Sequence, residues 1–594
     1  MGLGGGLNAM QSGMIRTSLA VIMLVLVVTS LYSSVALAEY NASVKLGLLA
    51  VDGATGNGIV VDAWLSVRSP GSGQVELEPS DLVEESTVLS TRVAFYLASI
   101  VNGLNPRLFD IHVLFETDSP VGGPSASGFI AAASLLALRG LIPDNTTTMT
   151  GMVSLTGFIL PVAGVSDKVA AAKAAGYKRV LVPLSEASNT TEGIAVEGVC
   201  TFEEAASLLS DNYALGTKTS QLSQQPPGPI KSREAEFRQH AELFIEKASQ
   251  LLDLLPRNET RYVIEMLLDK ARNILDNSPY SAASMAFMAF YMAASSVAME
   301  YGFNYLEEKT GLSLDAVLAN ASSVVEARLQ EFSGREICGL WGYEALAAAS
   351  VRLYLAEHAA DSDKPDVRVL ALLRALSAES WARLADPDYG PMVSCSLLGR
   401  AAEFFVDYMQ LSYNYIRSIV GHVLFNIPMP DDRDVSAWIS DAKRSLDEGN
   451  YPLALGLAVY VISSLEESLS HGARLPASCI DSHVMFLEEV SVLGSGSSLP
   501  AALVLEYALG YGDYIENVTK NPLLRESLEI DAITWLLHSL TVEALTADIP
   551  AGSQTVSVAW SNYYLLGITV EAVALAVIGY SLAVISRRAR AEEV

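Results

Sequence analysis

The sequence predicts an α+β domain, then a large all-α domain, and then one membrane-spanning helix near the C-terminus. β-rich and helical segments alternate between residues 39 and 212, a nearly continuous helical pattern covers residues 234–550, and an apolar run occupies residues 563–585. Because 594 residues exceed what one hydrophobic core usually organises, we expect several separate units.

The first domain is predicted from short β-rich segments that end in Gly, Ser or Pro turns and from segments with helical apolar periodicity. The expected strands are Val44–Val51, Ile59–Val67, Ile111–Phe115, Met152–Leu155 and Arg179–Val182. The expected helices are Leu82–Val101, Ser125–Arg139 and Lys168–Ala175. This mixture is typical of an α+β domain of ordinary size.

A linker is predicted at residues 213–233, because Thr217–Ser232 is rich in Gln, Ser and Pro and has no periodic apolar residues. In the helical pattern beyond it, the spacing of Ala, Leu-Asp, Tyr and Ala over Ala271–Ala283 recurs over Ala442–Ala454. A helix, a tight turn with an aromatic residue and a second helix resemble a tetratricopeptide (TPR)-like hairpin. Since the period is not regular, we predict helical hairpins and no regular repeat array.

The N-terminus carries a predicted signal peptide, residues 1–38. Arg16 precedes the apolar run Ser18–Leu31, and a small-residue exit ends at Ala38. This order is typical of secretory signal peptides, and an uncleaved signal anchor is the alternative. In both cases the following residues are exported.

The C-terminus carries a predicted transmembrane helix, Tyr563–Ile585. These 23 residues contain one charge, Glu571, and are long enough to span a hydrocarbon core. The arginines that follow, from Arg587 to Arg590, place the tail of residues 586–594 in the cytoplasm. We therefore expect a single-pass cell-membrane protein whose bulk is extracytoplasmic.

Charge and cysteine usage narrow the classes of partner. The net charge of −29 argues against nucleic acid and anionic membrane surfaces as partners. The four cysteines contain no CxxC pair and the seven histidines no HExxH motif, so we expect no metal and no cofactor. In an exported protein these cysteines are compatible with one or two structural disulfides, and their pairing stays open.

Ser125 is the candidate nucleophile. It lies in the segment GGPSASGF, where Pro124 and then small residues open a predicted helix. Free backbone N–H groups at a helix N-terminus, together with the positive end of the helix dipole, can stabilise an oxyanion beside this hydroxyl. Such a segment alone is more often a helix N-cap, and a serine nucleophile needs a base.

Lys168 is the candidate base. We expect Ser166 to cap the helix that begins there, which places Lys168 in the first turn. The helix dipole and apolar neighbours lower a lysine pKa, and a general-base lysine needs a pKa of about 7–8 instead of about 10.4. Thr150 is expected to orient the amine through a hydrogen bond. We expect Lys173, further along the same helix, to be a solvent-exposed surface lysine.

The region from Asp110 to Leu184 resembles the proteolytic domain of Lon-type (S16) serine proteases, which use a Ser–Lys dyad. GPSA around Ser125, MTG before Met152, LPVAGV before Ser166, DK at Lys168, and AAGYKRVLVP match in this order. The ordered set is far more specific than any one motif. The likeness covers roughly Val44–Leu209 and does not extend to the helical domain.

The resemblance implies a catalytic pair, Ser125 and Lys168, with Thr150, His112 and Glu85 in supporting positions. For His112, a core or supporting role is expected rather than that of the base. Three residues before the nucleophile, where Lon proteases commonly have an acidic residue, this sequence has Gly122. An acidic third member is therefore open, with Asp118, Glu116 or Glu85 as candidates.

The sequence contains no GxxxxGK[ST] motif, so the resemblance is to the ATP-independent, membrane-anchored Lon-like proteases predicted in archaea. The resulting hypothesis is a serine endopeptidase that cleaves unfolded or membrane-proximal polypeptides. The family resemblance also implies a homo-oligomeric ring. The alternative is a catalytically inactive Lon-like scaffold whose helical domain binds an envelope protein.

Overall fold

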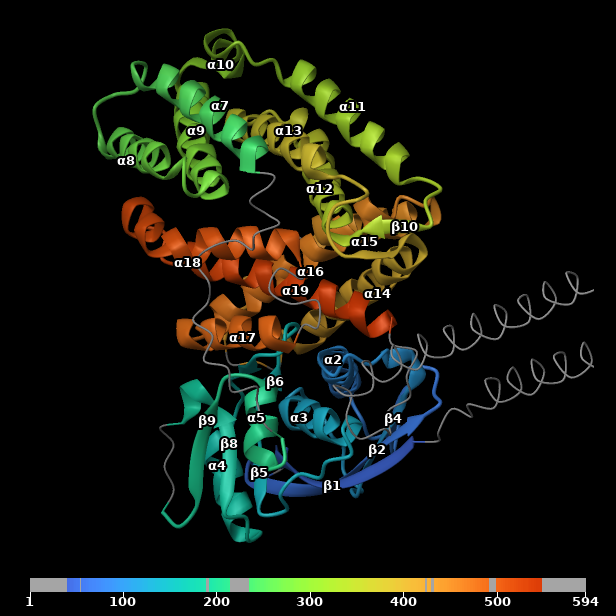
Figure 1. Cartoon of the computed structure of the whole chain (residues 1–594). Helices are drawn as coiled ribbons and strands as arrows, with labels where there is room; N and C mark the ends of the chain where they lie inside the picture. Colours follow the sequence, from blue (N-terminus) through green and yellow to red (C-terminus); the bar gives the residue numbers. More distant parts are fainter. Residues whose placement is uncertain are drawn as a thin grey trace, which may run out of the picture. The chain divides into compact units, whose positions relative to one another are not determined.

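The computed structural model describes residues 40–53, 55–187, 192–213, 234–421, 423, 425–428, 432–490 and 498–546. The described residues from 41 onward belong to one compact unit (Figure 1). By secondary structure they divide into a mixed part, residues 40–213, and a helical part, residues 234–546. The predicted signal peptide, the predicted linker from residue 214 onward and the predicted transmembrane helix lie outside the described residues.

A four-stranded sheet forms one half of the mixed part. In spatial order its strands are β1 (Tyr40–Val51), β2 (Gly58–Ser69), β4 (Asp110–Phe115) and β3 (Val75–Glu78). β2 runs antiparallel to β4, whereas β3 runs parallel to β4 along the edge. On β2, the fully buried Ala63, Leu65 and Val67 alternate with more exposed residues, as expected when one face of a sheet is covered. The helices α2 (Glu85–Val101) and α3 (Ser127–Leu138) pack against each other and against this sheet.

A second, parallel sheet forms the other half of the mixed part. Its strands, in order, are β5 (Thr147–Met149), β8 (Arg179–Pro183) and β9 (Ala195–Val199). Helix α4 (Val165–Ala174) packs on β8, and helix α5 (Phe202–Leu209) packs on β9. Between the sheets, β6 (Met152–Val153) and β7 (Ile159–Leu160) form a hairpin whose loop is residues 154–158. Two short 3-10 helices are η1 (Pro106–Leu108) and η2 (Leu184–Glu186).

The helical part is built from long helices and one small β ladder. Its helices are α7 (Glu234–Leu252), α8 (Glu259–Ile274), α9 (Pro279–Tyr301), α10 (Phe303–Thr310), α11 (Leu314–Phe332), α12 (Leu340–Ala360), α13 (Pro365–Leu384), α14 (Cys395–Ile419), α15 (Asp432–Asp447), α16 (Tyr451–Ala473), α17 (Ala477–Val490), α18 (Leu499–Thr519) and α19 (Leu524–Thr546). The ladder pairs β10 (Ile337–Gly339) with β11 (Met392–Ser394) in antiparallel register. Although α18 comes late in the sequence, it packs against α8, α9 and α12.

The secondary structure agrees with most of the expected elements. All five predicted strands and all three predicted helices of the mixed part are present, although the strand at Met152 ends at Val153. The predicted hairpins are also present, since α8 packs on α9 and α15 packs on α16, with Tyr280 and Tyr451 at the start of each second helix. The strands β3, β5, β7 and β9 of the mixed part were not predicted, because each has at most five residues and none carries a sustained apolar pattern.

Two described helices, α9 and α16, are long and apolar enough to span a membrane by length and composition. Each is nevertheless largely covered by protein, since 56% of the most apolar window of α9 and 78% of that of α16 is buried. Helix α16 packs against α12, α14, α15 and α19, and α9 packs against α7, α8 and α13. A core helix with this composition is sufficient to explain both.

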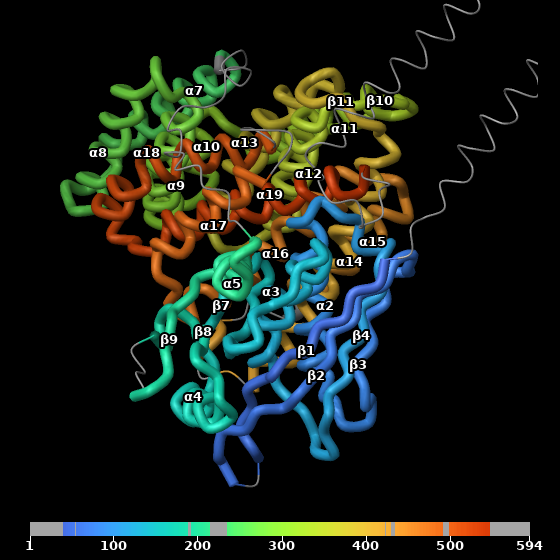
Figure 2. The backbone as a smooth tube through the Cα atoms, turned by 60° about the horizontal axis from the view of Figure 1, so that its bottom comes forward, coloured from blue at the N-terminus to red at the C-terminus, as the bar shows by residue number. Residues whose placement is uncertain are grey.

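Aromatic stacking joins the mixed part to the helical part. Tyr96 on α2 stacks on Tyr408 on α14, with ring centroids 3.8 Å apart and planes at 7°. The Tyr96 hydroxyl lies 3.2 Å from Oγ1 of Thr541 on α19. Figure 2 shows α14 running beside α2. Since Tyr96, Tyr408 and Thr541 are all buried, this contact lies in the interior where the two parts meet.

Two disulfides involve all four cysteines, and their pairing was open from sequence. Cys200, after β9, is bonded to Cys479 on α17 and so connects the mixed part to the helical part. Cys338 on β10 is bonded to Cys395 at the start of α14 and closes the small β ladder. The sequence separations are 279 and 57 residues respectively.

Removing the Cys200–Cys479 bond is expected to destabilise the protein more than removing the Cys338–Cys395 bond. The longer loop restricts the unfolded chain more, and for separations of 279 and 57 residues the loop-entropy relation gives a difference of about 1.4 kcal/mol. Urea unfolding of the double variants Cys200→Ala/Cys479→Ala and Cys338→Ala/Cys395→Ala measures both losses. An equal or reversed order would contradict this expectation.

Candidate active site

Ser125 lies directly before helix α3, on a turn fixed by Ser127. The helix begins at Ser127, with Ala126 as its N-cap residue. Both the backbone N–H and the side-chain hydroxyl of Ser127 donate to the carbonyl of Pro124, at 3.0 and 2.7 Å. The Pro124–Ser125 peptide bond is therefore held by the first residue of the helix. This placement at a helix N-terminus agrees with the prediction for Ser125.

The start of α2 holds the loop before Ser125 from one side. The backbone N–H of Glu84 donates to the carbonyl of Val121 at 2.9 Å. The N–H of Gly123 donates to Oγ of Ser86, and Oγ1 of Thr87 donates to the carbonyl of Gly123, both at 3.1 Å. These bonds connect a loop and a helix end that are separated by about 36 residues in the sequence.

The segment after β5 holds the same turn from the other side. The carbonyl of Ser125 accepts the N–H of Gly151 at 2.9 Å and the hydroxyl of Thr150 at 3.3 Å. In return, the N–H of Gly128 donates to the carbonyl of Gly151 at 3.0 Å. A Cβ on Gly128 would lie 2.9 Å from that carbonyl oxygen, so a glycine is needed for this close approach.

Lys168 lies in the first turn of α4, as predicted, but the helix cap differs from the prediction. The helix begins at Val165 and its N-cap is Gly164, with φ 69°, so the expectation that Ser166 caps the helix was wrong. A glycine adopts this left-handed conformation without the Cβ strain that a serine would have. Lys168 is therefore the fourth residue of the helix, and the residue is 3% exposed.

Burial is the cause of the altered acidity of Lys168. It lowers the pKa of this amine to about 8, because a charged ammonium group loses solvation in the interior. The start of β2 covers part of the turn that carries Lys168. A Cβ on Gly58 would lie 2.0 Å from the carbonyl oxygen of Asp167 and 2.8 Å from the backbone nitrogen of Lys168, so β2 packs directly on this turn.

The structure places the other predicted site residues as follows. Thr150 is buried, and its hydroxyl donates to Ser125 rather than to the Lys168 amine. The backbone N–H of Thr150 donates to Leu181 on β8, the strand on which α4 packs. His112 lies on β4 with its Nε2 3.4 Å from Oε2 of Glu78, and Glu85 is exposed in the first turn of α2. Thus Ser125 and Thr150 are in direct contact, and Lys168 lies on a helix that packs on β8, the strand to which the Thr150 N–H is bound.

Glu84 is a site residue that sequence reasoning missed. Its carboxylate lies against Gly122, where an added Cβ would be 2.1 Å from Oε2 and 2.2 Å from Cδ of Glu84. Glu84, the N-cap residue of α2, therefore brings to this loop the acidic group that position 122 lacks. Of the three expected acids, Glu116 accepts a hydrogen bond from Trp64 Nε1 at 2.8 Å instead. The adjacent Glu84 and Glu85 were visible in sequence, but their distance from Gly122 was not.

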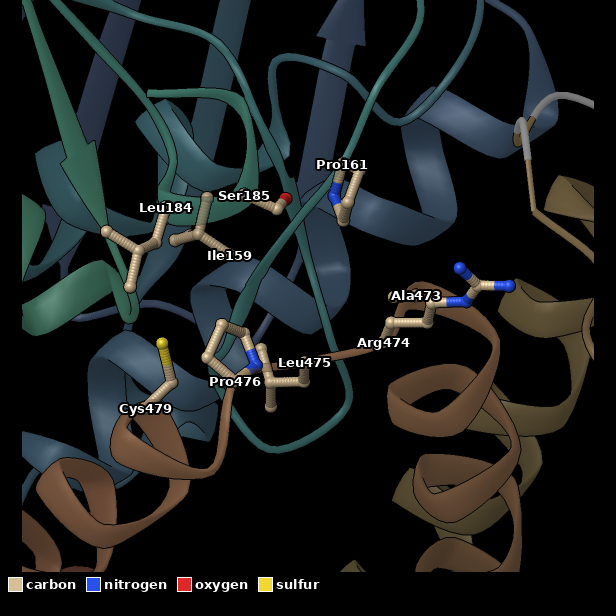
Figure 3. A pocket seen from close by; sticks show the side chains of 9 residues that line it. All are labelled: Ile159, Pro161, Leu184, Ser185, Ala473, Arg474, Leu475, Pro476 and Cys479. Atoms are coloured by element: carbon tan, nitrogen blue, oxygen red, sulfur yellow. The ribbon is translucent and has the colours of Figure 1, made fainter. Parts of the chain in front are cut away.

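Two hollows lie where the mixed part meets the helical part. The larger, ≈ 690 Å³, runs along the edge strand β3 and is lined by Ser72–Glu76, by Arg92 on α2 and by Asp407 on α14. The smaller is lined by Pro161 and Ser185 on one side and by Arg474 and Cys479 on the other (Figure 3). At ≈ 10 Å³ it has about the space that one water needs, so the junction beside the disulfide is closely packed.

Comparison with known proteins identifies the mixed part. Residues 43–195 match the family described as Lon protease (S16) C-terminal proteolytic domain, so this region is a Lon-type proteolytic domain. It is 38% identical over 105 residues to Lon protease 2 of Bacillus subtilis, which covers 17% of this chain and 19% of that protein. It is 35% identical over 118 residues to Lon protease of Methanosarcina barkeri, with 19% of this chain and 15% of that protein covered. The chain thus spans less than a fifth of the length of these relatives.

Introducing an acid at position 122 is expected to destabilise this chain. Gly122→Asp forces the end of the exposed Glu84 side chain to move, because a Cβ there would lie 2.1 Å from its carboxylate, and adds a second negative charge beside it, at a cost of about 0.5–1 kcal/mol. Glu84→Ala in the same chain should restore most of the loss. Gly510→Asp is the control, because a Cβ there meets nothing within 4 Å. Thermal unfolding measures all four proteins, and an unshifted Gly122→Asp variant would refute the packing argument.

Proposed function

We propose that the chain is a serine endopeptidase in which Ser125 is the nucleophile and Lys168 the general base. The observation that carries this proposal is the burial of Lys168, which lowers its pKa to about 8 within a Lon-type proteolytic domain. A lysine with this pKa is partly neutral near pH 7, as a base must be. The position of Ser125 at the N-terminus of α3 supports the role of nucleophile.

The reaction follows from these two groups. Lys168 takes the proton of the Ser125 hydroxyl as Oγ bonds to the carbonyl carbon of a peptide. Backbone N–H groups beside Ser125, other than those of Ser127 and Gly128, which are already hydrogen-bonded, stabilise the negative oxygen that forms. When the C–N bond breaks, the ammonium group of Lys168 returns the proton to the leaving amine. A water molecule, deprotonated by Lys168, then hydrolyses the acyl ester and regenerates Ser125.

The absence of a GxxxxGK[ST] motif in this sequence supports an ATP-independent enzyme. Without a motor to unfold them, folded proteins would be poor substrates, so the proposed substrates are unfolded or membrane-proximal polypeptides. The apolar run Tyr563–Ile585 and the arginines after it support a membrane anchor with the protease outside the cytoplasm. A homo-oligomeric ring is proposed from the Lon-type domain alone.

Ser125→Ala and Lys168→Ala are each expected to reduce cleavage of an unfolded protein such as casein by on the order of 10³-fold or more, without ATP. Lys173→Ala is the control, because Lys173 lies on the same helix and is exposed. A serine-reactive fluorophosphonate should label the wild type but not Ser125→Ala. Cleavage that persists in Ser125→Ala, or that requires ATP, would reject this function. An unlabelled, inactive wild type would favour the scaffold alternative.

The rate is expected to rise with pH. The pKa of Lys168 is lowered to about 8, so the fraction of neutral amine grows as the pH passes from below 8 to above it. The value of kcat/KM should therefore increase about tenfold per pH unit well below 8 and level off above it. A pH profile of peptide cleavage between 6 and 10 measures this. A profile that falls over this range would show that Lys168 acts in its charged form.

A further inference from the structure

The loop between β6 and β7, residues 154–158, is buried under the helical part. Side chains from α14, α16 and α17 form hydrogen bonds with the backbone of residues 153–156. These bonds join Tyr415 Oη to Val153 O (2.9 Å), Tyr408 Oη to Leu155 O, Glu466 Oε2 to Thr156 N (3.2 Å) and His483 Nε2 to Thr156 O (2.7 Å). All four side chains are buried, so these groups replace water as the partners of the loop.

Of the four, Tyr415 is connected to the turn that carries Ser125. Its hydroxyl donates to the carbonyl of Val153, the residue whose backbone N–H donates to the Ser127 hydroxyl. Ser127 Oγ accepts the N–H of Val153 at 2.9 Å and donates to the carbonyl of Pro124 at 2.7 Å. One buried hydroxyl of the helical part is therefore connected to the Pro124–Ser125 peptide bond by three hydrogen bonds that pass through Val153 and Ser127.

Burial restricts the movement of the hydrogen-bonded groups of Tyr415, Val153 and Ser127. Ser127 is 1% exposed, and Val153 and Tyr415 are fully buried, so water cannot substitute for a lost bond. An unpaired buried hydroxyl or carbonyl costs about 1–3 kcal/mol, which restricts the alternative positions of the group. Burial also raises the pKa of Tyr415 above its usual value, so its hydroxyl stays protonated and can donate.

We infer that Tyr415 is a positioning residue for Ser125, through which the helical part holds the nucleophile turn in its reactive geometry. The inference rests on the proposed function. It assigns the helical part a role in catalysis, in addition to any role in binding substrates. The mixed part then requires α14 to be docked for full activity, even though Tyr415 touches no substrate.

Tyr408 provides a matched control for Tyr415. Both tyrosines lie on α14, both are fully buried, and both donate to carbonyls of the same segment. Tyr408, however, bonds to Leu155 at the tip of the loop and stacks on Tyr96, whereas Tyr415 bonds to Val153, whose N–H is bound to Ser127. A purely structural role for these hydroxyls predicts equal effects of Tyr408→Phe and Tyr415→Phe.

The test compares the full chain with Tyr415→Phe and Tyr408→Phe. On a fluorogenic peptide, Tyr415→Phe should lower kcat on the order of tenfold or more with KM within about twofold, because misplacing a reacting atom affects the chemical step. The rate of fluorophosphonate labelling should fall in parallel. Tyr408→Phe should keep kcat within about twofold. Melting temperatures show whether the two variants are equally stable.

Ser127→Ala keeps the inference testable if Tyr415→Phe does not fold. It should reproduce the fall in kcat, and the double variant with Tyr415→Phe should lose less than the product of the single losses, since both act on one network. Equal kcat losses in Tyr408→Phe and Tyr415→Phe, or independent losses in the double variant, would overturn the inference and leave the proposed function standing. A wild type that Ser125→Ala does not inactivate would overturn both.

Discussion

The constraint on which the structure depends is that the backbone of residues 153–156 is buried and still needs hydrogen-bond partners. Within the mixed part, Val153 N is bound to Ser127, Ser154 N to Phe158 and Thr156 N to Ser154. The carbonyls of Val153, Leu155 and Thr156 are bound by Tyr415, Tyr408 and His483, and Glu466 is a second acceptor for Thr156 N. These four side chains come from helices more than 250 residues further along. The proteolytic domain and the helical part are thus two halves of one hydrogen-bonded interior.

Burial favours the neutral form of the ionisable groups in this interior. It raises the pKa of Glu466 to about 7 and that of Glu203 to about 8, and it lowers the pKa of His483 to about 4. The 3.8 Å contact between Glu203 and His483 is therefore a contact of neutral groups at neutral pH. Lys168 follows the same rule. Its loss of solvation lowers its pKa, so that part of the amine is neutral near neutral pH and can accept a proton. One physical cause accounts for the core of the junction and for the proposed base.

Local patterns in the sequence were enough to predict the longer strands and the helices of the mixed part, and the positions of Ser125 and Lys168 at the starts of two of these helices. The prediction used periodicity and an ordered set of motifs, both of which are local along the chain. It was wrong for the cap of α4, where Gly164 adopts a left-handed conformation and an added Cβ would lie 2.7 Å from Val51, a residue distant in sequence. The contact of Glu84 with Gly122, the pairing of Cys200 with Cys479 and the bond of Tyr415 to Val153 could not be predicted, because each joins segments distant in sequence.

The Cys200–Cys479 bond has a consequence for any cut in the chain between these residues. The segment it closes contains residues 214–233, which connect the mixed part to the helical part along the sequence. After one such cut, the proteolytic domain would still be covalently attached to α17, and through it to everything that follows. Cleavage would then change the connectivity of the molecule without separating its parts, and the two fragments would part only after reduction.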